Sequence, residues 1–263
     1  MLELKDVSKT FFPGTVNERK ALVDLSLRLE QGDFVTVIGS NGAGKSTMLN
    51  AITGRMKIDS GEIWIDNTDV KRMPDYKRAR YYGRVFQDPM AGTAPDLTIE
   101  QNLALALQRG KSRGLNLGLN AKRRAFFKEQ LEQLGLGLEN RLPARVGLLS
   151  GGQRQALSLL MAAFTKPSIL LLDEHTAALD PQRAAHVTQL TERIVSESGL
   201  TTLMVTHNME QAIALGNRLI MMHEGQIIHQ LEAEEKQKAT VKDLLGRFAD
   251  IKGAVLSDKQ MLG

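Results

Sequence analysis

The sequence predicts an α/β fold with a mainly parallel core sheet, an antiparallel β subdomain and an inserted α-helical subdomain. Short β-branched runs alternate with segments of helical periodicity, which is typical of strands connected by helices. The run SILLLD at 168–173 is apolar without alternation, as in a strand covered on both faces. The segments 2–11 and 21–30 alternate polar and apolar residues, so they predict antiparallel strands.

Further elements follow from the same patterns. Strands are expected at 33–39 and 201–207, a helix at 45–54, and a hairpin over 217–230 that turns at Glu224 and Gly225. Helices are expected at 98–110, with Thr98 as N-cap, and at 120–135. We therefore predict one domain over residues 1–231, in which a helical subdomain at about 88–165 is inserted. Residues 232–263 are predicted to form a charged tail with a helix at 240–248.

Composition restricts the function further. The chain has 263 residues, of which 42% are hydrophobic and none is cysteine. The absence of cysteine excludes disulfides and thiolate metal sites and favours a reducing compartment. No signal-peptide layout opens the chain, and no apolar run reaches the length of about 18 residues that a membrane span needs. We expect a cytoplasmic protein whose role at a membrane is peripheral.

One basic segment is conspicuous. From Arg109 to Lys128 the chain has seven Lys or Arg residues and no acid. Such a run fits a solvated face, an anionic lipid surface or a nucleic-acid backbone. The segment contains neither Tyr nor Trp, which disfavours a platform for stacking single-stranded nucleic acid.

A phosphate-binding loop is predicted at 39–47, GSNGAGKST, between an expected strand and an expected helix. It fits G-x-x-x-x-G-K-[ST], in which glycines let backbone N–H groups surround phosphates. Lys45 supplies a positive charge, and the Ser46 hydroxyl can bind Mg²⁺. A merely tight turn needs the glycines but not the Lys-Ser-Thr, so the core is predicted to be a phosphate-loop NTPase.

Three expected strands carry polar residues at their carboxyl ends, at Gln87, at Asp173 and Glu174, and at His207. Asp173 is expected to hold Mg²⁺ through water, and Glu174 to orient the attacking water. Adjacent acids are costly without such a use, although acids also cap strands with no function. Gln87 could touch both metal and water, and His207 could hydrogen-bond a γ-phosphate. Ligands lie beyond the carboxyl ends of parallel strands, where all these residues fall. His186, His223 and His229 are expected to be structural.

A second glycine turn opens LLSGGQRQALSLL at 148–160, with the layout of an anion-binding helix N-terminus but no Lys. The order GSNGAGKST, Gln87, LSGGQ (149–153), LLLDE, ALD (178–180) and His207 resembles the nucleotide-binding subunit of an ABC transporter, over residues 1–230. The chain, including FPGTVNE (12–18) and GRVFQDPMAGTAP (83–95), is especially similar to ATPase components of tryptophan/tyrosine-type importers.

The resemblance implies a role for each matching residue. Phe11 matches the aromatic that stacks on adenine, with Phe12 as the neighbouring alternative. The other matches are Walker A (Gly39, Ser40, Asn41, Gly42, Ala43, Gly44, Lys45, Ser46 and Thr47), the Q-loop (Gln87), the signature (Ser150, Gly151, Gly152 and Gln153), Walker B (Asp173), the catalytic carboxylate (Glu174), the D-loop (Asp180) and the switch histidine (His207). His175 stands where the family usually has Pro, which puts the stiffness of that turn in question.

The resemblance also implies a mechanism and partners. ATP and Mg²⁺ close a head-to-tail homodimer in which the signature of one subunit meets the ATP of the other, and hydrolysis reopens it. This cycle drives multi-span permease subunits, with a solute-binding protein, at the inner face of the membrane, and imports a small solute such as an aromatic amino acid. The alternatives are an exporter ATPase and a soluble ABC ATPase that acts on nucleic acid or ribosomes. The single cassette without heptads disfavours the latter, so no nucleic acid is expected.

Overall fold

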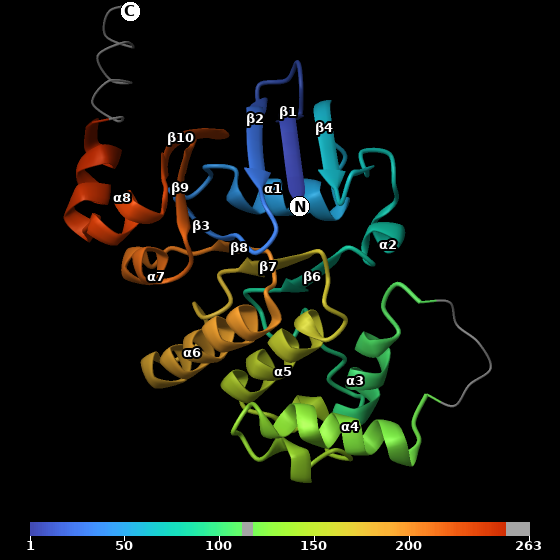
Figure 1. Cartoon of the computed structure of the whole chain (residues 1–263). Helices are drawn as coiled ribbons and strands as arrows, with labels where there is room; N and C mark the ends of the chain where they lie inside the picture. Colours follow the sequence, from blue (N-terminus) through green and yellow to red (C-terminus); the bar gives the residue numbers. More distant parts are fainter. Residues whose placement is uncertain (112–117, 251–263) are drawn as a thin grey trace, which may run out of the picture.

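The computed structural model describes residues 1–111 and 118–250. These residues form two β-sheets with helices packed against them (Figure 1). The smaller sheet has the order β2-β1-β4-β5 and is antiparallel throughout. Its strands are β1 (Leu2–Phe11), β2 (Arg19–Leu29), β4 (Ser60–Ile65) and β5 (Thr68–Asp69). The alternation of polar and apolar residues at the start of the chain therefore correctly predicted antiparallel strands.

The larger sheet has the order β10-β9-β3-β8-β7-β6. Its strands are β3 (Phe34–Gly39), β6 (Tyr82–Val85), β7 (Ile169–Asp173), β8 (Thr202–Val205), β9 (Arg218–His223) and β10 (Gln226–Leu231). All neighbours are parallel except the β9–β10 hairpin. That hairpin turns at Glu224 and Gly225, with φ of 44° and 82°, as the right-handed twist of paired strands requires.

Helices cover both faces of the larger sheet. α1 (Lys45–Thr53) lies between the two sheets, where Met48, Leu49 and Ile52 are buried together with residues of both. α5 (Gly151–Ala163) and α6 (Pro181–Ser198) pack on the opposite face (Figure 1). In β7, Leu171 is buried in the core beside α1, and Leu172 is buried in the core beside α5 and α6. Both faces of the strand are therefore covered, which explains the apolar run without alternation.

The segment between β6 and β7 is mainly helical. It contains α3 (Ile99–Leu107), α4 (Ala121–Glu132), the 3₁₀ turns η1 (Leu138–Asn140) and η2 (Val146–Leu148), and α5. Thr98 caps α3 in a reciprocal capping box with Gln101, as predicted for the N-cap. The helices expected at 98–110 and 120–135 end earlier, at Leu107 and Glu132. The apolar periodicity of the sequence continues past both residues, but the chain there forms turns.

The basic segment is not one continuous charged surface at its described positions. Arg109 turns inward, where its Nη2 donates to Met161 O at 3.0 Å and Ala162 O at 2.7 Å. Burial lowers the pKa of this guanidinium. Arg124 forms an ion pair with Glu100 at 2.7 Å. Arg109 therefore satisfies carbonyls near the end of α5, and residues 112–117 of the segment lie outside the described part of the chain.

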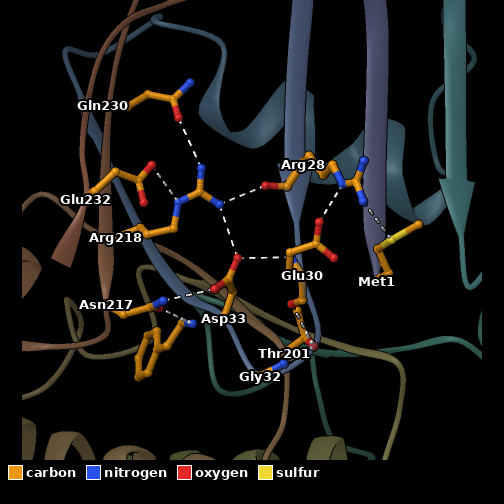
Figure 2. A network of polar contacts seen from close by, with 11 residues as sticks. Met1, Arg28, Glu30, Gly32, Asp33, Thr201, Asn217, Arg218, Gln230 and Glu232 are labelled. Carbon is orange, nitrogen blue, oxygen red and sulfur yellow. Dashed lines mark hydrogen bonds and ion pairs between the residues drawn. The ribbon is translucent and has the colours of Figure 1, made fainter.

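An arginine network joins the amino ends of β3 and β9 (Figure 2). Arg218 donates to Arg28 O at 2.8 Å and Asp33 at 3.2 Å, and its Nε lies 3.1 Å from a carboxylate oxygen of Glu232. Burial alone raises the pKa of Asp33, but hydrogen bonds from Asn217, from the Glu30 backbone and from Arg218 outweigh it, so the pKa is lowered. The network ties the two sheets at the edge opposite the predicted site.

Short helices complete the described structure: α2 (Asp75–Arg78), α7 (Met209–Ala214) and α8 (Ala233–Lys238). Residues 241–250 are also helical, over the segment where the tail helix is predicted. Among residues 1–111 and 118–250, none of the helices has the length and apolar character that crossing a membrane requires.

Candidate functional site

The loop between β3 and α1 has a backbone that requires glycine. Gly42 and Gly44 have φ of 84° and 99°, in the left-handed region that other residues rarely adopt. A Cβ at Gly39 would collide with the carbonyl oxygen of Met222, and one at Gly44 would lie 2.5 Å from Ala21 O. The loop leads directly into the N-terminus of α1, which carries partial positive charge and unpaired N–H groups.

Lys45 is folded back onto this loop. Its side chain is buried, and Nζ donates to Gly39 O at 2.6 Å and to Ser40 O at 3.1 Å. Burial lowers the pKa of the ammonium, whereas the negative charges of Glu174 and Asp173 act in the opposite direction. The lysine thus places a positive charge inside the loop.

A cavity of about 260 Å³ opens over the loop. It brings together most residues that the sequence assigned to nucleotide binding: Phe11, Asn41, Gly42, Ala43, Gly44, Lys45, Ser46, Thr47, Glu174 and His207. Phe12 is 66% exposed and does not line it. A concave site beside a phosphate-binding loop has the shape that a nucleotide needs.

Arg19 also lines this cavity and was missed in the sequence. It lies opposite Phe11 in the β1–β2 ladder, and its Nη2 donates to Gly42 O at 2.9 Å. A cross-strand neighbour of this kind has no fixed distance in the sequence from the loop that it supports, so no motif contains it.

Glu174 and His207 stand at the ends of adjacent strands β7 and β8. Glu174 has φ of 47°, an uncommon conformation for a residue other than glycine, and its N–H donates to Val205 O at 2.9 Å. The imidazole Nε2 of His207 contacts Glu174 Oε1. The carboxylate is nearly buried, while His207 is 46% exposed. Backbone strain of this kind is concentrated at functional sites.

Asp173, the last residue of β7, does not line the cavity. Its Oδ2 accepts from Arg84 Nη2 at 2.7 Å, in an ion pair whose two side chains are 14% and 7% exposed. Sequence reasoning did not single out Arg84, which belongs to the neighbouring strand β6.

Gln87 lies two residues beyond β6 and is exposed, outside the lining of the cavity. The parallel register nevertheless places the ends of β3, β6, β7 and β8 at one edge of the sheet, as the sequence predicted. The neighbouring Phe86 carbonyl accepts from Gln155 Nε2 of α5 at 3.0 Å. A buried side chain therefore connects this strand end to α5.

The second glycine turn lies in a different place. Ser150 caps α5 reciprocally with Gln153, with distances of 3.3 and 3.1 Å. Ser150, Gly152 and Gln153 line a separate cavity of about 360 Å³ that Arg183 also lines. Asp180 caps α6 through Arg183 N at 3.1 Å. The predicted site residues thus fall into two groups within one chain, and Ser150, Gly151, Gly152, Gln153 and Asp180 do not line the cavity over the loop.

His175 is buried directly behind Glu174. Burial lowers the pKa of its imidazole to about 4, so it is neutral near pH 7. Its Nε2 lies 2.9 Å from Thr191 Oγ1, and that hydroxyl donates to Val187 O at 2.8 Å. Because a hydroxyl has one proton, Thr191 accepts from His175. This hydrogen bond to α6 restrains the turn that a proline would restrain by its ring.

The residues present fit ATP with Mg²⁺. Ser46, Asp173 and Gln87 offer hydroxyl, carboxylate and amide oxygens, the ligand types that Mg²⁺ prefers. In residues 1–111 and 118–250 no cluster of three or more His, Cys, Asp or Glu could hold a metal ion.

The profile of the ABC transporter family matches residues 22–177. The chain belongs to this family. The tyrosine transport ATP-binding protein of Clostridioides difficile (strain R20291) is 46% identical over 249 residues, 94% of this chain and 98% of that protein. A spermidine/putrescine import ATP-binding protein of Mesoplasma florum is 34% identical over 86% of this chain, which spans 60% of that relative's length.

The fold of this ABC protein also matches solved cassettes. A dimeric structure of an ATP-binding cassette in a post-hydrolysis state, bound to ADP and Pi, superposes with a TM-score of 0.76 at 33% identity, covering 89% of this chain and 99% of that one. The predicted fold, the ATP-binding property and the ATPase class are thereby confirmed.

Proposed function

We propose that this ABC ATPase powers the import of a small solute, and that the solute is tyrosine or a related aromatic amino acid. The observation that carries the proposal is the similarity to a tyrosine transport ATP-binding protein over nearly the full length of both chains. The exporter alternative has less support, because the Mesoplasma florum relative is named an import protein. The ATPase domain comprises residues 1–231, including a helical subdomain inserted at about 88–165, and residues 232–263 form a tail.

The residues assigned to the site have separate tasks in binding and hydrolysing ATP. The loop from Gly39 to Thr47 and the Lys45 ammonium bind the phosphates, and Phe11 stacks on the base. Glu174 accepts a hydrogen bond from the attacking water and orients it, and the His207 imidazole donates toward the γ-phosphate when ATP is bound. Ser46, Asp173 and Gln87 would hold Mg²⁺, which would supply positive charge that neutralises the phosphate oxygens.

The protein works as a homodimer with ATP at the interface. Ser150, Gly151, Gly152, Gln153 and Asp180 are separate from the loop cavity of their own chain, and a head-to-tail partner would bring them to the phosphates. The Ser150 turn needs no lysine, because Lys45 of the other chain already lies on that nucleotide. Multi-span permease subunits and a solute-binding protein complete the importer, and this subunit attaches peripherally at the inner face of the membrane.

Replacing Glu174 by Gln tests the proposal. The variant should bind ATP with unchanged affinity and lose about 10²-fold or more in turnover, because an amide does not polarise water. In vesicles that also contain the permease and the binding protein, ATP-driven uptake of labelled tyrosine should stop. Glu224→Gln is the matched control, since Glu224 also has a positive φ but lies in the exposed β9–β10 turn. Turnover at the wild-type rate in Glu174→Gln would contradict the catalytic role of Glu174. ATP hydrolysis without tyrosine uptake by vesicles that contain the unsubstituted protein would contradict tyrosine as the substrate.

A further inference from the structure

Arg84 stands beside the carboxylate to which the proposed function gives a metal. Its Nη2 donates to Asp173 Oδ2 at 2.7 Å, and its Nη1 donates to Asn50 Oδ1 of α1 at 2.8 Å. The guanidinium also lies 4.8 Å from the ring centroid of Phe86, next to Gln87. One side chain thus contacts the loop helix α1, the end of β7 and the segment that follows β6.

These contacts differ from those of an arginine that only supports the fold. Arg78, also nearly buried, uses Nε, Nη1 and Nη2 to donate to backbone carbonyls. Arg84 donates to side chains, and its buried Nε has no partner among the described residues. A buried N–H donor without a partner costs free energy. Attraction to the charge of Asp173, rather than hydrogen bonding of every guanidinium N–H group, therefore explains the position of Arg84.

The ion pair changes what Asp173 can bind. In the described part of the chain, Oδ1 accepts no hydrogen bond, whereas Oδ2 is occupied by Arg84. A positive charge this close neutralises the carboxylate and repels a second cation at the same place. In the described residues, no group of three or more His, Cys, Asp or Glu side chains could hold a metal ion.

We propose that Arg84 is a positioning residue that neutralises Asp173 and leaves one carboxylate oxygen for the metal, so that a divalent cation binds there only together with nucleotide phosphates. The inference rests on the proposed metal role of Asp173. Without nucleotide the site holds the arginine instead of a cation, and the phosphates of ATP supply the additional negative charge that makes the cation favourable.

Mn²⁺ binding to the nucleotide-free protein, measured from the electron paramagnetic resonance signal of free Mn²⁺, tests this inference without any turnover. Arg84→Gln should bind Mn²⁺ at least about tenfold more tightly than the wild type, because the competing charge is gone. Arg84→Lys should bind as weakly as the wild type, and Arg84→Gln with Asp173→Asn should lose the gain. Arg55→Gln is the matched control, because Arg55 also lies over the Phe86 ring, at 5.1 Å, and is exposed.

Equal Mn²⁺ affinity in Arg84→Gln and the wild type would overturn the inference. Asp173→Asn separates it from the proposed function: if this variant binds Mn²⁺ normally in the presence of ATP, the metal role of Asp173 fails and the inference fails with it. If only the Arg84→Gln effect is missing, Arg84 alone has been misassigned.

A second measurement uses the unsubstituted protein, in case Arg84→Gln does not fold. The guanidinium ¹⁵N–¹H resonances of Arg84, assigned with Arg84→Lys, should shift when Mg²⁺ is added to the complex with a non-hydrolysable ATP analogue. They should not shift when Mg²⁺ is added without nucleotide. A shift in the nucleotide-free protein, or none in the complex, would contradict the proposal.

Discussion

His207 and Glu174 meet at the edge of the parallel sheet, with the imidazole Nε2 in contact with the carboxylate Oε1. The two residues follow β8 and β7, which are adjacent and parallel, so their separation of more than thirty positions in the sequence disappears in the fold. Glu174 is held at a positive φ by its N–H bond to Val205 O, and Asn208 caps α7 directly after His207. Both sides of the contact are therefore positioned by the backbone.

We predict that His207→Ala lowers ATP turnover by about 10²-fold, the effect expected when a donor near developing charge is removed. ATP affinity should change little, because the loop and Lys45 remain. Steady-state hydrolysis and nucleotide binding measured on the same preparation distinguish the two effects. His223→Ala is the control, since His223 also ends a strand of this sheet but lies near Glu224 instead. A parallel loss in both variants would show that stability, not chemistry, is affected.

Phe11 and Phe12 are adjacent in the sequence but only Phe11 lines the cavity. We predict that Phe11→Ala weakens ATP binding by about tenfold, since stacking of an aromatic side chain on a base contributes about 1–3 kcal/mol. Phe12→Ala should leave the affinity unchanged, because that ring is two-thirds exposed. Titration with a fluorescent ATP analogue provides the comparison, and a larger loss in Phe12→Ala would assign the stacking role to the other ring.

His175 predicts a specific dependence of stability on pH. Its pKa is about 4 in the folded protein, below the ordinary value of 6.5, so the unfolded chain binds the proton more readily. This contribution to stability is complete above the unfolded pKa and is lost as pH falls toward about 4. Between pH 7 and pH 5 the wild type should lose about 2 kcal/mol from this group.

His175→Pro removes the titrating group and serves as the reference. Urea unfolding at the two pH values should show a smaller loss in the variant, by about that amount. Thr191→Val should destabilise the protein by about 1–3 kcal/mol at pH 7, because the buried Nε2–H loses its acceptor. If wild type and His175→Pro respond equally to pH, the burial of a neutral imidazole does not determine acid stability.

The sequence predicted those parts of the molecule that local chemistry decides. The Thr98 cap, the turn at Glu224 and Gly225, and the strand–loop–helix around Lys45 each depend on neighbouring residues, and each is found where expected. The contacts of Arg84 and Arg109 could not be predicted from neighbouring residues in the sequence. Arg84 meets Asp173 across 89 positions, and Arg109 turns into the end of α5 although it begins a segment rich in basic residues. Long-range pairing depends on register and packing, which no short pattern contains.

The last prediction tests whether Ser150 acts on the ATP of another subunit. Ser150→Arg should bind ATP through its own loop and be inactive, because a bulky charge occupies the place of the partner's phosphates. Lys45→Ala should be inactive because the phosphate charge is lost. In a mixed head-to-tail dimer one site has both defects and the other has neither, since it combines Lys45 of one chain with Ser150 of the other. Mixing the variants should therefore restore ATPase activity, up to one competent site per mixed dimer.

Action of Ser150 within its own chain predicts the opposite, because every site would then carry one defect at any mixing ratio. Cross-linking checks the geometry independently of turnover, in a chain without cysteine. Cysteines at 150 and 41 on separate chains should join when ATP is bound and Glu174→Gln blocks hydrolysis. Asn41 is preferable to Gly42, whose φ of 84° would strain any other residue. If mixing restores nothing and no cross-link forms, the two groups of site residues do not meet across a dimer interface.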